Sequence, residues 1–323
     1  MIVGVSPAIR RAVALAERYA RTRLAVLIVG ATGTGKELVA RHIHERSGRP
    51  GRLVDVNCCA LPREMVESLL FGHRRGAFTG ATESTVGHIE CSDGGTLFLD
   101  ELASLGFEAQ GKLLRVLETE ELQPLGSVTK KQVDLRVLST AQDDLEGVLT
   151  SGRFRRDLFQ RVAGVVIPLP RLTDRREDVV PLARHFAELS GRRLEADAER
   201  VLLDYDWPGN VRELRLTIER AGALVTNGTL PAEAIAEAIE LGRVTRGTDV
   251  RLSDDRATLI RTCQAYGWHA GRICRALSIG RTTLYGRLRE AGLSLRQIKK
   301  DQVVHDCSEQ SRTIEQGARV TDR

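Results

Sequence analysis

A glycine-rich segment near the N-terminus of the 323-residue chain has the spacing of a phosphate-binding loop. It follows a short apolar run and precedes a stretch with helical periodicity. Its residues are Gly30, Ala31, Thr32, Gly33, Thr34, Gly35 and Lys36. The glycines leave backbone N–H groups free to surround phosphate oxygens, and the lysine places a positive charge on the β and γ phosphates. The segment therefore predicts a nucleotide site.

An acidic pair ends another apolar run. Asp100 and Glu101 directly follow the apolar residues 96–99. Carboxylates at the carboxyl end of a buried parallel strand lie beside the phosphate loop in sheets of this kind. We therefore predict that Asp100 holds Mg²⁺ and that Glu101 polarises the attacking water in ATP hydrolysis. The alternative is a solvated acidic pair at a strand end.

The elements that must position these groups alternate along the first half of the chain. Apolar runs of strand type lie at residues 24–29, 53–56, 96–99, 133–139 and 165–167, with helical patterns such as 8–20 and 108–118 between them. This alternation predicts an α/β fold with a parallel sheet covered by helices on both faces. After Pro170 the predicted strands stop, and residues 177–240 are expected to be wholly helical.

The net charge of +5 is concentrated in one segment. Residues 251–300 contain 11 basic and 3 acidic residues, whereas residues 1–250 contain 34 and 35. Such a concentration is expected of a module that binds nucleic acid. A solvated basic face is the alternative.

Composition also excludes some classes of protein. The chain has no apolar run long enough to span a bilayer. The charges of Arg10, Arg11 and Glu17 are incompatible with a signal peptide. The six cysteines form no CxxC pair, so we expect reduced thiols. We therefore expect a cytoplasmic protein without a membrane partner.

Seven short motifs follow one another across residues 2–240. They are Val56-Asn-Cys58, Leu69-Leu-Phe-Gly-His73, Gly76-Ala-Phe-Thr-Gly-Ala81, Gly94-Gly-Thr-Leu-Phe-Leu-Asp-Glu101, Lys112-Leu-Leu-Arg-Val-Leu117, Phe154-Arg-Arg-Asp-Leu158 and Trp207-Pro-Gly-Asn-Val-Arg-Glu-Leu214. In this order they resemble the AAA+ domain of bacterial enhancer-binding proteins, the activators of sigma-54 RNA polymerase. The general loop motif has serine or threonine after the lysine, where this chain has Glu37. The family also tolerates glutamate there, so Glu37 is included among the ATP-binding residues.

The resemblance implies roles for residues that spacing alone does not single out. Asn57 matches the switch residue that holds the catalytic glutamate, here Glu101. Arg155 and Arg161 match two arginine fingers that reach into a neighbouring subunit's site. By spacing alone, either could be an ordinary surface arginine.

Two further positions match the sensors of this family. Thr140 corresponds to the threonine of the first sensor motif, and Arg212 to the arginine of the helical lid. The position after Thr140, often asparagine or histidine in the family, is Ala141.

The loop from residue 76 to 81 matches the segment with which these proteins contact sigma-54. The matched residues are Gly76, Ala77, Phe78, Thr79, Gly80 and Ala81. Phe78 and Thr79 occupy its tip. Without the family, this segment would be interpreted as a flexible turn.

The basic segment resembles a Fis-type helix-turn-helix over residues 253–297. Residues 271–277 and 281–289 are its two predicted helices, and the second would enter DNA. The residues expected to face DNA are Arg281, Thr282, Thr283, Tyr285, Arg287 and Arg289. A helical hairpin that only packs against the ring is the alternative.

These assignments divide the chain into five parts. We expect an AAA+ α/β subdomain at 1–171 and an all-α lid at 172–241. A linker at 242–252 then leads to the helix-turn-helix at 253–297, and residues 298–323 are expected to lack stable structure.

The implied function is activation of transcription. The chain would bind enhancer DNA as a homo-hexamer and remodel closed complexes of sigma-54 RNA polymerase holoenzyme into open ones, with ATP and Mg²⁺. An AAA+ remodeller of another protein client is one alternative. A DNA-binding regulator with a silent ATPase is the other.

The ATPase pattern begins close to Met1, so we expect that the chain lacks an N-terminal regulatory domain. If Met1 is the natural start, we expect control by a regulator protein in trans, by hetero-oligomers with a paralogue, or by expression level.

Overall fold

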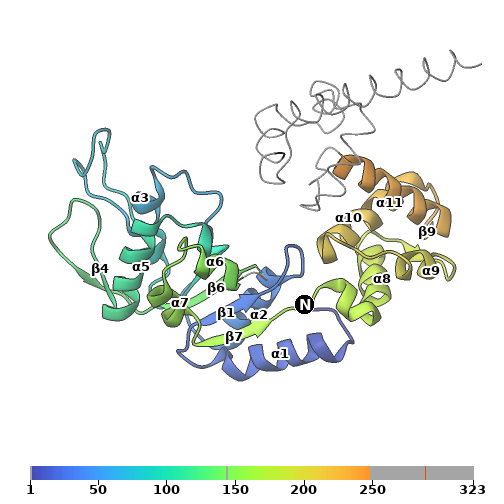
Figure 1. Ribbon diagram of the computed structural model, residues 1–323, viewed down its shortest axis with the longest axis horizontal. Helices are drawn as coiled ribbons and strands as arrows, with labels where there is room; N and C mark the ends of the chain where they lie inside the picture. The colour runs from blue at the N-terminus through green and yellow to red at the C-terminus, as the bar shows by residue number, and fades with distance from the viewer. Residues whose placement is uncertain (1, 143–144, 248–287, 289–323) are drawn as a thin grey trace, which may run out of the picture. The chain divides into compact units, whose positions relative to one another are not determined.

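The computed structural model describes residues 2–142, 145–247 and 288 (Figure 1). Contacts divide the chain into two compact units, Met1–Ala238 and Ile239–Arg323. The predicted DNA-facing residues and the predicted tail lie outside the described residues. Leu288 is helical and 1% exposed.

Within the described residues, five strands form one parallel sheet in the order β2-β3-β6-β1-β7. They are β1 (Val26–Val29), β2 (Leu53–Asn57), β3 (Thr96–Asp100), β6 (Arg136–Ala141) and β7 (Val165–Pro168). The predicted α/β class is confirmed. The central strands β1, β3 and β6 are buried almost throughout, which favours apolar residues in the sequence, whereas the edge strands β2 and β7 are partly exposed.

Alternate residues of β3 enter opposite cores. Leu97 and Leu99 pack with one cluster, which contains residues of α3 (Val66–Phe71), α5 (Phe107–Thr119) and α7 (Arg156–Val162). Phe98 packs with the other, which contains residues of α1 (Pro7–Ala20) and α2 (Lys36–Ser47). The side-chain period of two explains this division. The sheet thus has a helical layer on each face.

Shorter elements complete the α/β part. They are α4 (His88–Cys91), the 3₁₀ turn η1 (Leu102–Ser104), the antiparallel pair β4 (Glu121–Leu122) and β5 (Lys131–Gln132), and α6 (Leu145–Thr150). The turn η1 directly follows the acidic pair at the end of β3. It therefore links that pair to α5, which begins a few residues later.

Helices dominate after β7. They are η2 (Leu172–Asp178), α8 (Val179–Leu189), α9 (Ala198–Leu203), α10 (Asn210–Leu224) and α11 (Ala232–Gly247). The expectation of a wholly helical segment was wrong, because β8 (Arg193–Leu194) pairs in parallel with β9 (Thr229–Leu230). Two-residue strands are too short to leave a detectable period in the sequence. No described helix is long and apolar enough to cross a membrane.

Asp178, at the end of η2, joins the start of the chain to the helical part. This fully buried carboxylate accepts hydrogen bonds from the backbone N–H of Val5 and Ser6 at 2.5 and 2.7 Å, and from the Ser6 hydroxyl at 2.7 Å. Ser6 also caps α1 by accepting from the Ile9 N–H. A buried charge needs such partners to offset its lost hydration.

Candidate nucleotide site

The predicted phosphate loop connects β1 to α2. Gly33 and Gly35 have φ angles of 80° and 105°, in the left-handed region that glycine adopts most readily. Gly35 is the N-cap of α2 and provides no side-chain hydrogen bond to the first turn. The N–H groups at the start of α2 can therefore bind an anion, which the helix dipole also attracts.

Three consecutive carbonyls of the loop accept hydrogen bonds from the helical part of the same unit. The pairs are Thr32 O with Asn210 Nδ2 at 3.0 Å, Gly33 O with the Arg212 N–H at 3.2 Å, and Thr34 O with Arg175 Nη2 at 2.8 Å. Because a trans peptide directs its C=O and N–H to opposite sides, these contacts turn the following N–H groups away from the lid. The lid thus helps to fix the loop conformation.

Close packing accompanies these hydrogen bonds. Asn210 is 3% exposed, has a left-handed φ of 54°, and accepts from the Leu172 N–H at 2.8 Å. A Cβ atom on Gly33 would lie 2.4 Å from Gly209 O. Sequence reasoning missed Asn210 and Arg175, although Asn210 lies within the Trp207–Leu214 motif. Arg175 had no distinguishing signal among the many arginines of the chain.

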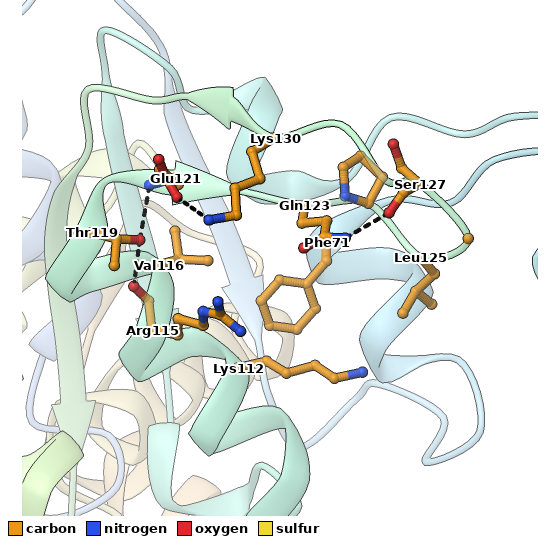
Figure 2. Close-up of a pocket in the computed structure, with 12 residues that line it drawn as sticks. Phe71, Lys112, Arg115, Val116, Thr119, Glu121, Gln123, Leu125, Ser127 and Lys130 are labelled. Atoms are coloured by element: carbon orange, nitrogen blue, oxygen red, sulfur yellow. Dashed lines mark hydrogen bonds and ion pairs between the residues drawn. The ribbon is translucent and has the colours of Figure 1, made fainter.

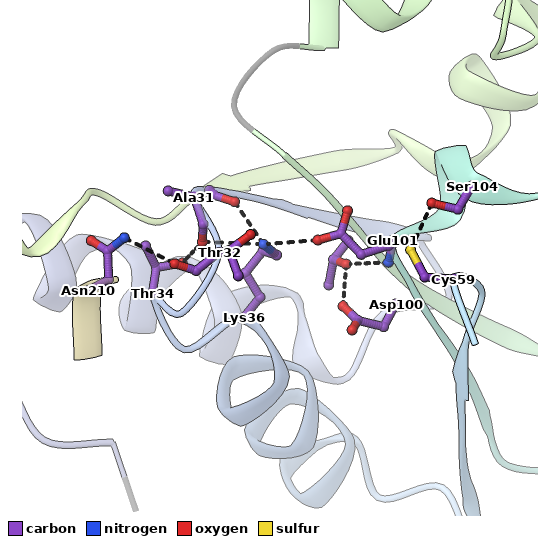
Figure 3. Close-up of polar contacts among 11 residues, drawn as sticks. Ala31, Thr32, Thr34, Lys36, Cys59, Asp100, Glu101, Ser104 and Asn210 are labelled. Carbon is purple, nitrogen blue, oxygen red and sulfur yellow. Dashed lines mark hydrogen bonds and ion pairs between the residues drawn. The ribbon is translucent and has the colours of Figure 1, made fainter. Parts of the chain in front are cut away.

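Lys36 carries the positive charge of the loop. Its side chain is 8% exposed, and Nζ donates to Gly30 O at 2.8 Å and to Ala31 O at 3.3 Å. Nζ also lies 3.7 Å from Glu101 Oε1 (Figure 3). The structure therefore brings the loop lysine and the acidic pair together, as the sequence predicted for a nucleotide site.

Thr140 organises the acidic pair. It lies on β6, and its hydroxyl donates to Asp100 Oδ1 at 2.6 Å and accepts from the Glu101 N–H at 2.8 Å. Glu101 has a φ of 55°, an uncommon backbone conformation for a residue other than glycine. The hydrogen bond from its N–H to Thr140 supports this conformation, which directs Glu101 towards Lys36.

Asn57 lies at the end of β2, opposite Asp100 in the strand register. The resemblance implied that its side chain holds Glu101, but the structure gives it another partner. Its Oδ1 accepts from the backbone N–H groups of Cys59 and Ala60 at 3.0 and 3.2 Å. Asn57 therefore closes the turn after β2, while the Glu101 carboxylate pairs with Lys36.

Two adjacent cysteines follow Asn57. Burial, with the nearby charge of Asp100, raises the pKa of the Cys58 thiol to about 12, so it is protonated at neutral pH. Cys59 is exposed, and its Sγ lies 2.9 Å from Ser104 Oγ on the turn after Glu101 (Figure 3). Both are free thiols in the structure.

Glu37 faces away from this charged cluster. Its carboxylate accepts from Arg41 Nε and Nη2 at 3.0 and 2.8 Å on the exposed face of α2, and this contact raises the pKa of Arg41. Asp100, the last residue of β3, is the carboxylate that the Thr140 hydroxyl holds next to Glu101. Mg²⁺ bound to a nucleotide needs only one or two protein carboxylates besides phosphate and water. Asp100 therefore fits the role of a Mg²⁺ ligand. Among the described residues, no group of three His, Cys, Asp or Glu side chains could hold a metal by itself.

The two predicted arginine fingers contact α5. Arg155 forms a two-point pair with Asp157 at 2.8 and 3.1 Å, which raises its pKa, and its guanidinium lies 4.9 Å from the centre of the Phe107 ring. Arg161 Nε donates to Leu117 O at 3.0 Å, near the other end of α5. Both arginines thus contact residues of α5, Arg155 at the Phe107 ring and Arg161 at Leu117 O.

The loop matched to sigma-54 contact is closed by its own backbone. The Gly76 N–H donates to Ala81 O at 2.8 Å, and the Ala81 N–H donates to Phe78 O at 3.0 Å. Phe78 is 47% exposed and lies 5.0 Å from the His73 ring between centroids. Thr79 is also exposed. The loop thus presents an aromatic ring and a hydroxyl to solvent.

A pocket of about 270 Å³ lies away from the phosphate loop, between α5 and residues 121–130 (Figure 2). Lys112, Arg115 and Lys130 give its lining a positive character. One wall includes Leu125, whose backbone pairs with Gly72 and Arg74 at the base of the 76–81 loop. No sequence motif predicted this pocket.

Comparison with known proteins gives these features a context. Residues 2–168 match the sigma-54 interaction domain, and residues 173–250 match the AAA+ ATPase lid domain. The anaerobic nitric oxide reductase transcription regulator NorR of Salmonella agona is 46% identical over 245 residues, covering 73% of this chain and 48% of NorR. The Nif-specific regulatory protein of Rhodobacter capsulatus is 44% identical over 242 residues, covering 73% and 42%.

This chain therefore spans about half the length of these curated relatives. Among solved structures, NtrX from Brucella abortus in complex with ATP is similar, with a TM-score of 0.66 and 33% identity over 90% of this chain and 69% of that one. The domain match covers more than half of the chain and contains both the phosphate loop and the acidic pair. The chain belongs to the family of sigma-54-dependent transcriptional activators, with the fold of an AAA+ phosphate-loop NTPase.

Proposed function

We propose that this chain hydrolyses ATP and uses the free energy to convert closed complexes of sigma-54 RNA polymerase holoenzyme into open complexes. The main support for this proposal is the cluster of Lys36, Asp100 and Glu101 in a chain that matches the sigma-54 interaction domain. The ATP complex of NtrX supports ATP as the nucleotide.

The ion pair between Lys36 and Glu101 indicates how the site responds to its substrate. Phosphate oxygens that enter the loop compete for Lys36, which releases the Glu101 carboxylate to polarise water. Thr140 meanwhile keeps Asp100 at the strand end, where it would hold Mg²⁺. The bound metal would neutralise charge that develops on the β and γ phosphates.

Arg155 and Arg161 are proposed to act on the nucleotide of a neighbouring subunit. Their contacts within the chain lie along α5 and at Asp157, not at the phosphate loop. A homo-hexamer would supply these arginines in trans, and a hetero-oligomer with a paralogue is the alternative assembly. Arg212, whose backbone touches Gly33, is proposed to sense the nucleotide from the lid.

Three further interactions are part of the proposal. Phe78 and Thr79 contact sigma-54, and their exposure supports this. The basic segment at 251–300 binds enhancer DNA, which its charge supports. Control by a regulator protein in trans is the third, with co-assembly with a paralogue or expression level as the alternatives.

The test is open-complex formation on a sigma-54 promoter, with purified protein at concentrations that permit assembly without an enhancer. We expect heparin-resistant complexes with wild type and ATP, and none without ATP. Thr79→Ala is the matched variant, since it removes one exposed hydroxyl far from the loop lysine. It should keep ATPase activity and lose open complexes.

Other outcomes of these assays would support one of the alternative functions. Equal loss of both activities in Thr79→Ala would contradict the role of the 76–81 loop. Rapid hydrolysis by wild type without open complexes would indicate a different protein client. DNA binding without hydrolysis would indicate a silent ATPase.

A further inference from the structure

A buried amide on α5 joins two segments of the chain. Gln110 is fully buried, and its Nε2 donates to Leu105 O at 2.7 Å and to Arg153 O at 3.0 Å. Its Oε1 accepts from the Arg155 N–H at 2.9 Å. These contacts use both NH₂ hydrogens and the carbonyl oxygen of the side chain. Gln110 therefore connects the residues before α5 to those before α7.

The segment on one side begins at the acidic pair. The Ser104 N–H donates to Glu101 O at 2.9 Å, and the Leu105 N–H donates to Leu102 O at 3.1 Å. The turn η1 thus fixes Leu105 relative to Glu101. The carbonyl that Gln110 contacts therefore belongs to the same hydrogen-bonded turn as the backbone of Glu101.

The segment on the other side presents Arg155. Its guanidinium contacts the exposed groups Asp157 and Phe107, which must release it if it is to reach a neighbour's phosphates. Such exposed contacts contribute little to a fixed position. The hydrogen bond from the Arg155 backbone to Gln110 is made to a buried amide and can persist when the guanidinium moves.

We propose that Gln110 is the positioning residue of Arg155. It fixes the backbone from which the guanidinium extends to the neighbouring site, and ties that backbone to the turn after Glu101 in its own subunit. This inference rests on the proposed function, in which Arg155 acts in trans.

The first test is Gln110→Met in the full chain, which keeps the length of the side chain and removes its hydrogen bonds. The kcat for ATP should fall by about 10²-fold, the effect of misplacing a catalytic group by about 1 Å. Affinity for a fluorescent ATP analogue should not change, because the subunit's own loop is intact. The matched control is Gln160→Met on the exposed face of α7, which should hydrolyse ATP like wild type.

Mixed oligomers distinguish a trans effect from a cis effect. Glu101→Gln subunits have an inactive site but an intact Arg155, so mixing them with Gln110→Met subunits should restore hydrolysis. Mixing Gln110→Met with Arg155→Ala should restore nothing, because both lack a working arginine. The reference is a mixture of Glu101→Gln with Arg155→Ala subunits. Its ATPase activity is the level expected for the mixture of Glu101→Gln with Gln110→Met.

The opposite pattern, with restoration only by Arg155→Ala, would overturn the inference because Gln110 would then act on its own site. Wild-type kcat in Gln110→Met would overturn it too. If the reference mixture itself stays inactive, the proposed trans action fails and this inference fails with it.

Circular dichroism would detect a folding defect in Gln110→Met. In that case a second variant, Gln110→Glu, tests the inference instead. In Gln110→Glu, a protonated carboxyl supplies one donor and one acceptor, whereas the ionised form supplies no donor. Its kcat relative to wild type should fall as pH rises, with the same pattern in mixtures. A constant ratio across pH would contradict the hydrogen-bonding role.

Discussion

At the scale of single residues, Thr140 determines where the two acidic groups can act. The resemblance predicted a sensor of the nucleotide, and the structure adds contacts of its hydroxyl with the Asp100 side chain and the Glu101 backbone. Both contacts are made at the end of β3, next to the ion pair of Glu101 with Lys36. Loss of the hydroxyl should therefore disturb catalysis more than nucleotide binding.

The variant Thr140→Val preserves shape and leaves the Glu101 N–H without its partner. Leaving this part-buried N–H unsatisfied costs about 1–3 kcal/mol. If Glu101 loses that much of its positioning in the transition state, kcat should fall by about 5- to 150-fold. The affinity for an ATP analogue should change much less. Steady-state ATPase assays and equilibrium titration measure the two quantities.

The neighbouring Ser139 provides the control. Its hydroxyl is buried without a hydrogen-bond partner among the described residues. Ser139→Ala should therefore leave kcat unchanged and should not lower the free energy of unfolding. An equal loss of kcat in both variants would mean that Thr140 acts only through packing.

At the scale of elements, the lid and the phosphate loop form one hydrogen-bonded unit. Asn210, Arg212 and Arg175 each donate to a loop carbonyl. The approach is close enough that Gly33 has no space for a side chain. Movement of the lid should consequently change the loop, and a bulkier loop should displace the lid.

The variant Gly33→Ala tests this coupling. Its methyl group would collide with Gly209 O, and overpacking of this kind costs about 1–3 kcal/mol. Affinity for ATP should fall by about tenfold or more, as measured by titration with a fluorescent analogue.

Gly48→Ala is its control, because Gly48 also has a left-handed φ, 74°, at the C-cap of α2 but no atom within 4 Å of the added Cβ. This variant should lose stability through its backbone conformation while keeping ATP affinity. Equal loss of ATP affinity in both variants would contradict the proposal that contact between the lid and Gly33 controls nucleotide binding.

At the scale of the whole molecule, the proposed arginine fingers make activity a property of the assembly. Sites that need a neighbour's Arg155 hydrolyse ATP only when subunits associate. Specific ATPase activity should therefore rise with protein concentration, while nucleotide bound per chain stays constant.

Sedimentation over the same dilution series would relate the rise to oligomer formation. DNA that carries enhancer sites should shift the rise in specific ATPase activity to lower protein concentrations. Binding to the same DNA raises the local concentration of subunits and so favours their association. Constant specific activity down to concentrations where the chain sediments as a monomer would show that no neighbour is needed.

The sequence by itself determined the class of fold, the phosphate loop, the acidic pair and the family. These features are local: glycine spacing, carboxylates after an apolar run, and motifs of a few residues. The central strands β1, β3 and β6 are buried almost throughout, which favours apolar residues along them. Such a local pattern needs no information from distant parts of the chain. The loop from Gly30 to Lys36 could be identified because its glycine and lysine spacing is likewise a local pattern.

Only the tertiary structure decided which groups meet. Asn210 and Thr32 are 178 residues apart, Arg175 and Thr34 are 141 apart, and nothing in their local sequence indicates a contact. The turn-closing role of Asn57 and the bridge made by Gln110 likewise depend on backbone atoms of other segments. A backbone N–H or C=O is present at nearly every residue, so sequence cannot specify which one a buried side chain will satisfy. The path of the folded chain makes that choice, because it brings distant carbonyls and amides within hydrogen-bonding distance.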